Sequence, residues 1–174
     1  QSIFKENNPT LVIENKVLYT KKLQNQILIG YESNISDEKY PTLKISPHER
    51  KPAITILCYG EVLEDVEKAI ELAFDEEEIF CEIICPSQIN PINITPILKS
   101  VSTTKRLLTV EEGTNIASYS SEIAAIIMEN NMQLNSFVRL ANNEIIPSSA
   151  KAELDILPNI NSIFEKIKET FYGK

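Results

Sequence analysis

The sequence contains only four glycines and one histidine among its 174 residues, and it contains no tryptophan. Loops that cradle phosphate groups, such as GxGxxG or the P-loop, need closely spaced glycines, and neither motif occurs. The GxSxG and HExxH motifs are missing as well, which argues against an α/β-hydrolase and against a zinc metalloprotease. The single histidine, His48, follows Pro47 in a polar stretch, where a lone histidine is usually exposed and inert. We therefore predict no catalytic residue in this chain.

Cysteines are also few, and their odd number argues against a disulfide framework. Cys58, Cys81 and Cys85 lie within apolar runs, which indicates buried thiols in a reducing compartment. Cys81 and Cys85 are close in sequence, but a zinc site needs further cysteines or histidines than His48 alone provides. We therefore expect no metal site and a cytoplasmic location.

Basic residues are outnumbered, and the net charge is −8 with a pI near 4.8. No basic stripe is available to neutralise phosphates, so we expect no nucleic-acid partner. No apolar run approaches the roughly 18 residues of a membrane span, and the start of the chain does not resemble a signal peptide. The length is sufficient for one full core with an additional segment.

The first fifty residues differ in composition from the remainder. Residues 9–14 form a short strand pattern. Residues 21–52 are polar and include Pro41 and Pro47, which indicates a linker that contributes one edge strand. We place a domain boundary near residue 50. Because the chain begins with Gln1, we expect it to be a piece of a longer polypeptide.

From residue 53 onward, strand and helix patterns alternate. The predicted strands are 53–59, 79–84, 106–111 and 136–140, and the predicted helices are 61–74, 93–101, 117–130 and 159–172. Residues 141–155 have the composition of a long loop. This alternation predicts a three-layer α/β/α sandwich with a mostly parallel five-stranded sheet and one antiparallel edge strand.

One loop is a candidate functional site because it follows a buried strand and precedes a helix, the usual place for ligands in open α/β sheets. It consists of Glu111, Glu112, Gly113, Thr114 and Asn115. Gly113 is predicted to form a left-handed turn, and Ser118, Ser120 and Ser121 are candidate helix caps. Glu111 and Glu112 could form a general-base pair, but adjacent residues at a strand end point apart, so we favour a structural role for them. A purely structural junction is the alternative, since every strand–helix unit has such a loop.

Several motifs resemble the C-terminal domain of transketolase. Residues 54–60 (ITILCYG) are similar to its strand–TYG–helix opening, and residues 105–113 (KRLLTVEEG) and 122–125 (EIAA) are similar to later motifs. The strongest resemblance is to the β subunit of thiamine-diphosphate-dependent 2-oxo acid dehydrogenases of the pyruvate or branched-chain type. Residues 9–19 resemble the last strand of the pyrimidine-binding domain of that subunit. The segment 117–121 (ASYSS) departs from the usual Gly-Phe-Gly.

The resemblance implies that residues 1–50 are the end of a pyrimidine-binding domain plus a linker, and that residues 51–174 are the transketolase C-terminal-like domain. It also implies that thiamine diphosphate and Mg are bound by the whole enzyme and that no cofactor is bound by this chain. The domain would support assembly, as a homo-oligomer and with an α-type subunit. The whole complex would decarboxylate a 2-oxo acid oxidatively, or the whole protein would be a transketolase-like enzyme. The chain alone would be inactive.

Dimerisation is expected through the open sheet edge and the helices near residues 113–130. Two alternatives are a regulatory domain that binds a small molecule at residues 111–115, and a free-standing adaptor that has lost catalysis.

Overall fold

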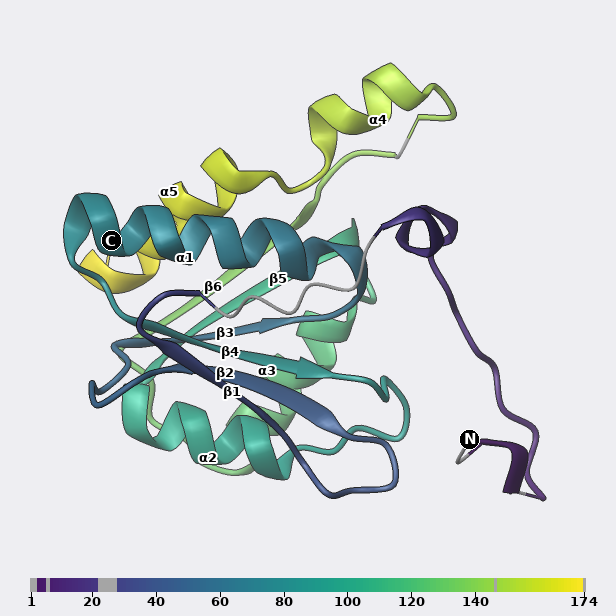
Figure 1. The fold of residues 1–174 in the computed structure, drawn as a ribbon, viewed down its shortest axis with the longest axis horizontal. Helices are drawn as coiled ribbons and strands as arrows, with labels where there is room; N and C mark the ends of the chain where they lie inside the picture. Colours follow the sequence, from purple (N-terminus) through teal and green to yellow (C-terminus); the bar gives the residue numbers. More distant parts are fainter. Residues whose placement is uncertain (1–2, 6, 22–27, 146, 174) are drawn as a thin grey trace.

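The fold is that of a computed structural model, which describes residues 3–5, 7–21, 28–145 and 147–173. In Figure 1 these residues form an α/β domain in which helices cover both faces of a six-stranded sheet. The strands are β1 (Tyr31–Ile35), β2 (Thr42–Pro47), β3 (Ile54–Cys58), β4 (Cys81–Pro86), β5 (Arg106–Thr114) and β6 (Ser136–Asn142). The helices are α1 (Leu63–Glu77), α2 (Thr95–Thr104), α3 (Tyr119–Glu129), α4 (Ala150–Ile156) and α5 (Ile160–Tyr172), with short 3-10 turns η1 (Ile3–Lys5), η2 (Lys16–Thr20) and η3 (Gly60–Val62).

The strand order is β1-β2-β4-β3-β5-β6. Strands β4, β3, β5 and β6 run parallel, whereas β1 and β2 form an antiparallel pair at one edge. The predicted fold class is therefore confirmed, but the described sheet has six strands instead of five, and its antiparallel strand, β2, lies one position in from the edge strand β1. The additional strand, β1, is almost entirely exposed and polar, so it lacks the alternation that identifies a strand from sequence.

Two apolar clusters hold the three layers together. Ile54, Ile56 and Ile83 pack with α1 and α5 on one face, whereas Leu57 and Ile84 pack with α2 and α3 on the other. Successive residues of a strand point to opposite faces, so a strand covered on both sides must be apolar throughout. This is why β3 is buried along its whole length.

Polar side chains cap the first turns of two helices. The Ser118 side chain caps α3 and accepts a hydrogen bond from the Ser121 amide at 3.2 Å, as predicted. Asn159 caps α5 in a reciprocal pair with Ser162. Helix α2 extends beyond the predicted end at residue 101 and reaches Thr104.

Two sequence predictions outside the sheet are wrong. Residues 150–156, expected within a loop, form α4. Residues 9–14, expected to be a strand, have no assigned strand partner among the described residues, and Leu11 and Ile13 are each 86% exposed. The segment extends away from the domain in Figure 1. Lys21, farther along the chain, forms ion pairs with Glu61 of η3 and with Glu64 of α1.

The predicted boundary near residue 50 stays a prediction, and part of the predicted linker, residues 22–27, lies outside the described residues. None of the helices within the described ranges has both the length and the apolar character needed to cross a membrane.

Candidate functional site

The predicted site at residues 111–115 is not a loop, because residues 111–114 continue strand β5. The strand is prolonged by its neighbour β6: the Asn115 amide donates to the Asn142 carbonyl at 2.7 Å, and the Asn142 side chain donates to the Glu112 carbonyl at 2.7 Å. The register between β5 and β6 shifts between Val110 and Thr114, which is typical of a bulge.

The predicted left-handed turn at Gly113 is also wrong. Gly113 does not have a positive φ, whereas Ala117, four residues later, has a φ of 54°. The chain therefore turns toward α3 after β5 has ended, at a residue whose type gives no signal of a left-handed conformation.

Glu111 is buried, and its carboxylate lies against the start of α3. It accepts hydrogen bonds from the amides of Tyr119 and Ser120, each at 3.2 Å, and from the Tyr59 hydroxyl at 3.2 Å. Amides in the first turn of a helix have no partner within the helix, and the positive end of the helix dipole favours a carboxylate. The Glu111 carboxylate is therefore buried because it binds the first amides of α3, and these hydrogen bonds hold the helix in position.

Tyr59 and Tyr119 stack edge to face beside this carboxylate, with ring centroids 5.4 Å apart. Burial raises the pKa of each phenol to about 12, and the nearby Glu111 charge contributes to both shifts. Both side chains are therefore protonated at neutral pH. The hydroxyl of Tyr119 is buried and has no hydrogen-bond partner among the residues that the structure describes.

Glu112 points to the other side of the strand, as predicted for adjacent residues. Its half-buried carboxyl has a raised pKa, first because of burial and then because of repulsion by Glu61, Asp65 and Glu153. The two glutamates therefore have different surroundings: Glu111 contacts α3 and Tyr59, whereas Glu112 faces other acidic residues.

A groove of about 780 Å³ lies next to Tyr59 and Tyr119, at the carboxyl ends of the central strands. Its lining contains none of the five predicted site residues. It is formed by Tyr59, Ile89, Asn90, Pro91, Ile92, Ala117, Ser118, Tyr119, Ser121, Glu122 and Ile126.

A second hollow, of about 350 Å³, is lined by Thr114 and Asn115 together with residues of β6 and of the segment that follows it. Arg139 of β6 donates to the Ser121 hydroxyl at 3.0 Å and to the Asn115 carbonyl at 2.9 Å. The five predicted site residues are thus divided among three places. One sequence signal could have indicated this second hollow, since Arg139 is the single charged residue in an otherwise apolar stretch of β6.

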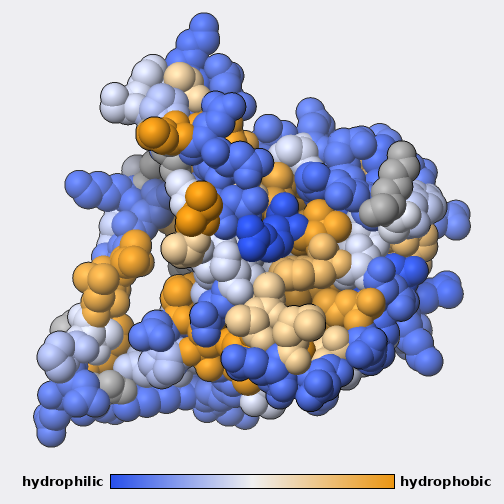
Figure 2. All heavy atoms as spheres, turned by 180° about the vertical axis from the view of Figure 1, so that it is seen from behind, coloured by the Kyte–Doolittle hydropathy of each residue, from blue (hydrophilic) through white to orange (hydrophobic). Residues whose placement is uncertain are grey.

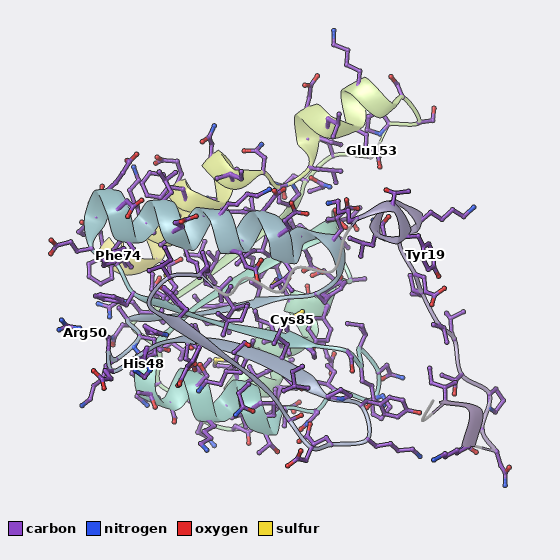
Figure 3. All side chains as sticks on the ribbon, viewed as in Figure 1. Tyr19, His48, Arg50, Phe74, Cys85 and Glu153 are labelled. Atoms are coloured by element: carbon purple, nitrogen blue, oxygen red, sulfur yellow. The ribbon has the colours of Figure 1, made fainter. Side chains whose placement is uncertain are left out.

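The described residues do not fit a metal or a diphosphate cofactor. His48 is exposed, lies 3.7 Å from Glu32 and from Glu49, and occupies the end of the domain opposite Tyr19 in Figure 3. No three potential ligands from His, Cys, Asp or Glu converge within the described part of the chain. At α3, the Glu111 carboxylate already occupies the position that a diphosphate would need, and its charge would repel one.

Comparison with known proteins agrees with the architecture. The transketolase C-terminal domain model matches residues 44–163. The β subunit of the pyruvate dehydrogenase E1 component of Rickettsia bellii is 27% identical over 98% of this chain, and that of Staphylococcus aureus (strain Mu50) is 28% identical over 97%. The chain spans about half (50%) the length of these curated relatives.

Among solved structures, a split-gene transketolase described as an inactive β4 tetramer superposes with a TM-score of 0.63. The sequences are 17% identical, and the match covers 74% of this chain and 42% of that one. This likeness shows the fold. Since the family match extends over more than half of the sequence, the chain belongs to the transketolase C-terminal domain family.

Proposed function

We propose that this chain is the C-terminal assembly domain of the β-type half of a thiamine-diphosphate-dependent 2-oxo acid dehydrogenase. The observation that carries the proposal is the similarity to pyruvate dehydrogenase E1 β subunits along nearly the whole chain. In this proposal the rest of the protein and an α-type subunit supply thiamine diphosphate and Mg, and the complex works in the cytoplasm. The free thiols of Cys58, Cys81 and Cys85 suit a reducing compartment.

The two edges of the sheet support an assembly role. At the β1 edge, Glu32, Ser33 and Asn34 are exposed, and polar edges of this kind discourage pairing with another chain. At the β6 edge, Phe137 and Val138 are half-buried, and this strand pairs with β5 alone among the described strands. The β6 edge is therefore the better suited of the two to an interface.

Helix α3, next to this edge in the fold, also presents apolar side chains. Met128 is 73% exposed and Ile126 is half-buried. Figure 2 views the molecule from behind and shows apolar side chains gathered in its lower half, the half that holds α2 and α3 in Figure 1. Apolar surface of this kind is common at protein interfaces.

Sedimentation velocity over a concentration series tests the assembly role directly. We expect the chain to self-associate and Ile126→Asp to weaken the association. Because Ile126 is half-buried, Met128→Lys serves as a second variant that the fold tolerates, and Leu154→Lys, at an equally exposed site on α4, is the matched control. A chain that stays monomeric at high concentration, or an equal response of Met128→Lys and Leu154→Lys, would count against the proposal.

The proposal also makes a statement about the gene. We expect the upstream reading frame to encode a pyrimidine-binding domain, with an α-subunit gene nearby. A neighbourhood without either would favour the free-standing adaptor.

The groove beside Tyr59 and Tyr119 supports a second candidate, a domain that binds a small apolar ligand. The groove combines apolar walls with the unpartnered Tyr119 hydroxyl. A fragment screen followed by isoleucine methyl NMR tests it: fragments should shift the signals of Ile89, Ile92 and Ile126, and Tyr119→Phe should weaken polar fragments selectively. Shifts elsewhere only, or none, would remove this candidate.

A further inference from the structure

Two of the three cysteines lie side by side near the carboxyl ends of the central strands. The register of β3 and β4 pairs Leu57 with Ile84, so Cys58 and Cys85 follow as neighbours on the two strands. Both belong to the face of the sheet covered by α1 and α5, where Cys85 packs against the cluster that contains Cys58. The assembly role makes no use of this pair. We infer that Cys58 and Cys85 are a redox-sensitive pair, which a peroxide converts reversibly into a disulfide.

The backbone brings the two thiols within reach of a bond. Neighbouring strands lie about 4.8 Å apart, and a disulfide needs Cα atoms about 4.4–6.8 Å apart. A hydrogen bond already joins the side chains of Cys58 and Cys85, and both thiols are free. The disulfide can therefore form without a large movement of the backbone.

The two thiols differ in exposure and in reactivity. Cys58 is fully buried, whereas Cys85 is partly exposed and can be reached from solvent. The hydrogen bond from Cys58 lowers the pKa of Cys85, against the opposing effects of burial and of the Glu67 carboxylate. The same hydrogen bond, together with burial, raises the pKa of Cys58. Because the thiolate is the nucleophile, Cys85 is the residue that reacts first.

The reaction balances with a peroxide as the oxidant. The Cys85 thiolate attacks one peroxide oxygen and forms a sulfenic acid, while the O–O bond breaks and the other oxygen leaves with the proton that Cys85 lost. The Cys58 thiol then attacks the sulfenic sulfur, the S–O bond breaks, and water leaves with the Cys58 proton as the disulfide forms. The two thiols thus lose two electrons together, and one peroxide is reduced.

The disulfide would also be reduced readily. The Cβ atoms of a disulfide lie about 3.8 Å apart, so a bridge between adjacent strands has to draw them closer than their usual spacing of about 4.8 Å. Strained disulfides are more easily reduced than relaxed ones, and they are the ones with regulatory roles. In a reducing compartment the pair would therefore return to two thiols once the peroxide is consumed.

The position of the pair links its oxidation to the start of α3. In Figure 3 Cys85 lies toward the end of the sheet that is farther from His48. Cys58 directly precedes Tyr59, whose hydroxyl donates to Glu111 at 3.2 Å, and Glu111 accepts from the first amides of α3. A bridge that draws the end of β3 toward β4 would therefore weaken the contact between Tyr59 and Glu111.

Mass spectrometry of the reduced chain after treatment with hydrogen peroxide tests the inference. We expect the intact mass to fall by two hydrogen atoms, and the thiols that iodoacetamide labels in urea to fall from three to one, because two of them enter the bridge. Dithiothreitol should restore all three, and a non-reducing peptide map should join Cys58 to Cys85. No loss of mass, a disulfide that includes Cys81, or oxygen added to Cys85 without a disulfide would overturn the inference.

Matched serine variants separate the pair from the third thiol. Cys85→Ser should abolish the mass loss, whereas Cys81→Ser should keep it, because the register partner of Cys81 is Ile54. Cys85 is partly exposed, so the fold should tolerate its variant, and the peptide map of the unaltered chain needs no variant. A mass loss that persists in Cys85→Ser would refute the pairing.

Hydrogen exchange tests the link to α3. The amides of Tyr119 and Ser120 should exchange faster in the oxidised chain than in the reduced one, because Glu111 holds them less firmly. Cys85→Ser treated with the same peroxide is the control and should show no change. Equal exchange in the oxidised and reduced chains would refute the link.

Discussion

The two halves of strand β5 differ in what holds them. Residues 106–110 pair in parallel with β3 on one side and with β6 on the other, and Leu107 and Leu108 are fully buried on opposite faces. Residues 111–114 extend past the end of β3 and have β6 as their one neighbour among the described strands, across a register shift. In this second half the side chains are held by individual polar contacts instead of by the core.

The difference shows how one continuous strand can be part core and part surface structure. In the first half, many apolar contacts act together, and the loss of any one side chain creates a cavity. In the second half, each residue has its own environment: Glu111 holds the start of α3, Glu112 faces other carboxylates, and Gly113 has open space around the position of a Cβ atom. Substitutions should therefore have graded effects along the strand.

The largest effect is expected for Leu108→Ala in the first half. Leu108 is fully buried between the sheet and the α1 and α5 layer, so its truncation should lower the free energy of unfolding by about 3 kcal/mol. Urea denaturation followed by circular dichroism measures this. A loss below about 1 kcal/mol would mean that the core refills the cavity.

Glu111→Ala should come second, with a loss of about 2 kcal/mol, because two helix amides and a tyrosine hydroxyl lose their acceptor. Hydrogen exchange adds a local readout: the amides of Tyr119 and Ser120 should lose protection, while those of α5 should not. Glu111→Gln, which keeps one acceptor oxygen, should fall between the wild type and Glu111→Ala. Equal protection of α3 in all three proteins would contradict the positioning role.

Glu112→Gln should stabilise the protein at neutral pH, by about 0.5 kcal/mol given the partial exposure of this group. The folded-state pKa of Glu112 lies above its ordinary value, so the folded protein binds this proton more tightly than the unfolded chain does. Its contribution to stability is therefore greatest at low pH and is lost as pH rises through the raised pKa. The advantage of Glu112→Gln over the wild type should disappear below about pH 4.

The smallest effect is expected for Gly113→Ala. Gly113 has no positive φ, and nothing lies within 4 Å of an added Cβ, so the change in unfolding free energy should stay within about 0.5 kcal/mol. The companion Ala117→Gly should be mildly stabilising, because Ala117 has a φ of 54°. If Gly113→Ala lowered the unfolding free energy strongly and Ala117→Gly did not raise it, a left-handed turn at residue 113 would be favoured instead.

Much of the fold could be predicted because hydrophobic periodicity reports burial directly. Ile54 and Ile56 of β3, and Ile163 and Ile167 of α5, follow the spacing of elements whose faces are covered, and they are fully buried. Strand β1 and helix α4 could not be predicted in this way. The exposed residues of β1 have no pattern, and β1 is a strand because β2 supplies its hydrogen bonds.

The candidate site was predicted less well, because its residues depend on contacts with distant parts of the chain. Glu111 and the capping residue Ser118 were identified from sequence. The hydrogen bonds of Glu111, however, come from Tyr59, which lies 52 residues earlier in the chain, and from the start of α3. Arg139 and Asn115, 24 residues apart, form their hydrogen bond only when β6 lies beside β5. Local propensity carries no information about such pairs.

The sequence by itself determined the α/β class, the order of the central elements and the family, because each of these depends on local patterns and short motifs. The tertiary structure alone decided where β5 ends, which residue takes the left-handed turn, and which groups Arg139 contacts at the β6 edge. The physical reason is that the backbone of residues 111–115 has no strong preference of its own, so hydrogen bonds from Asn142 and from the start of α3 set its conformation.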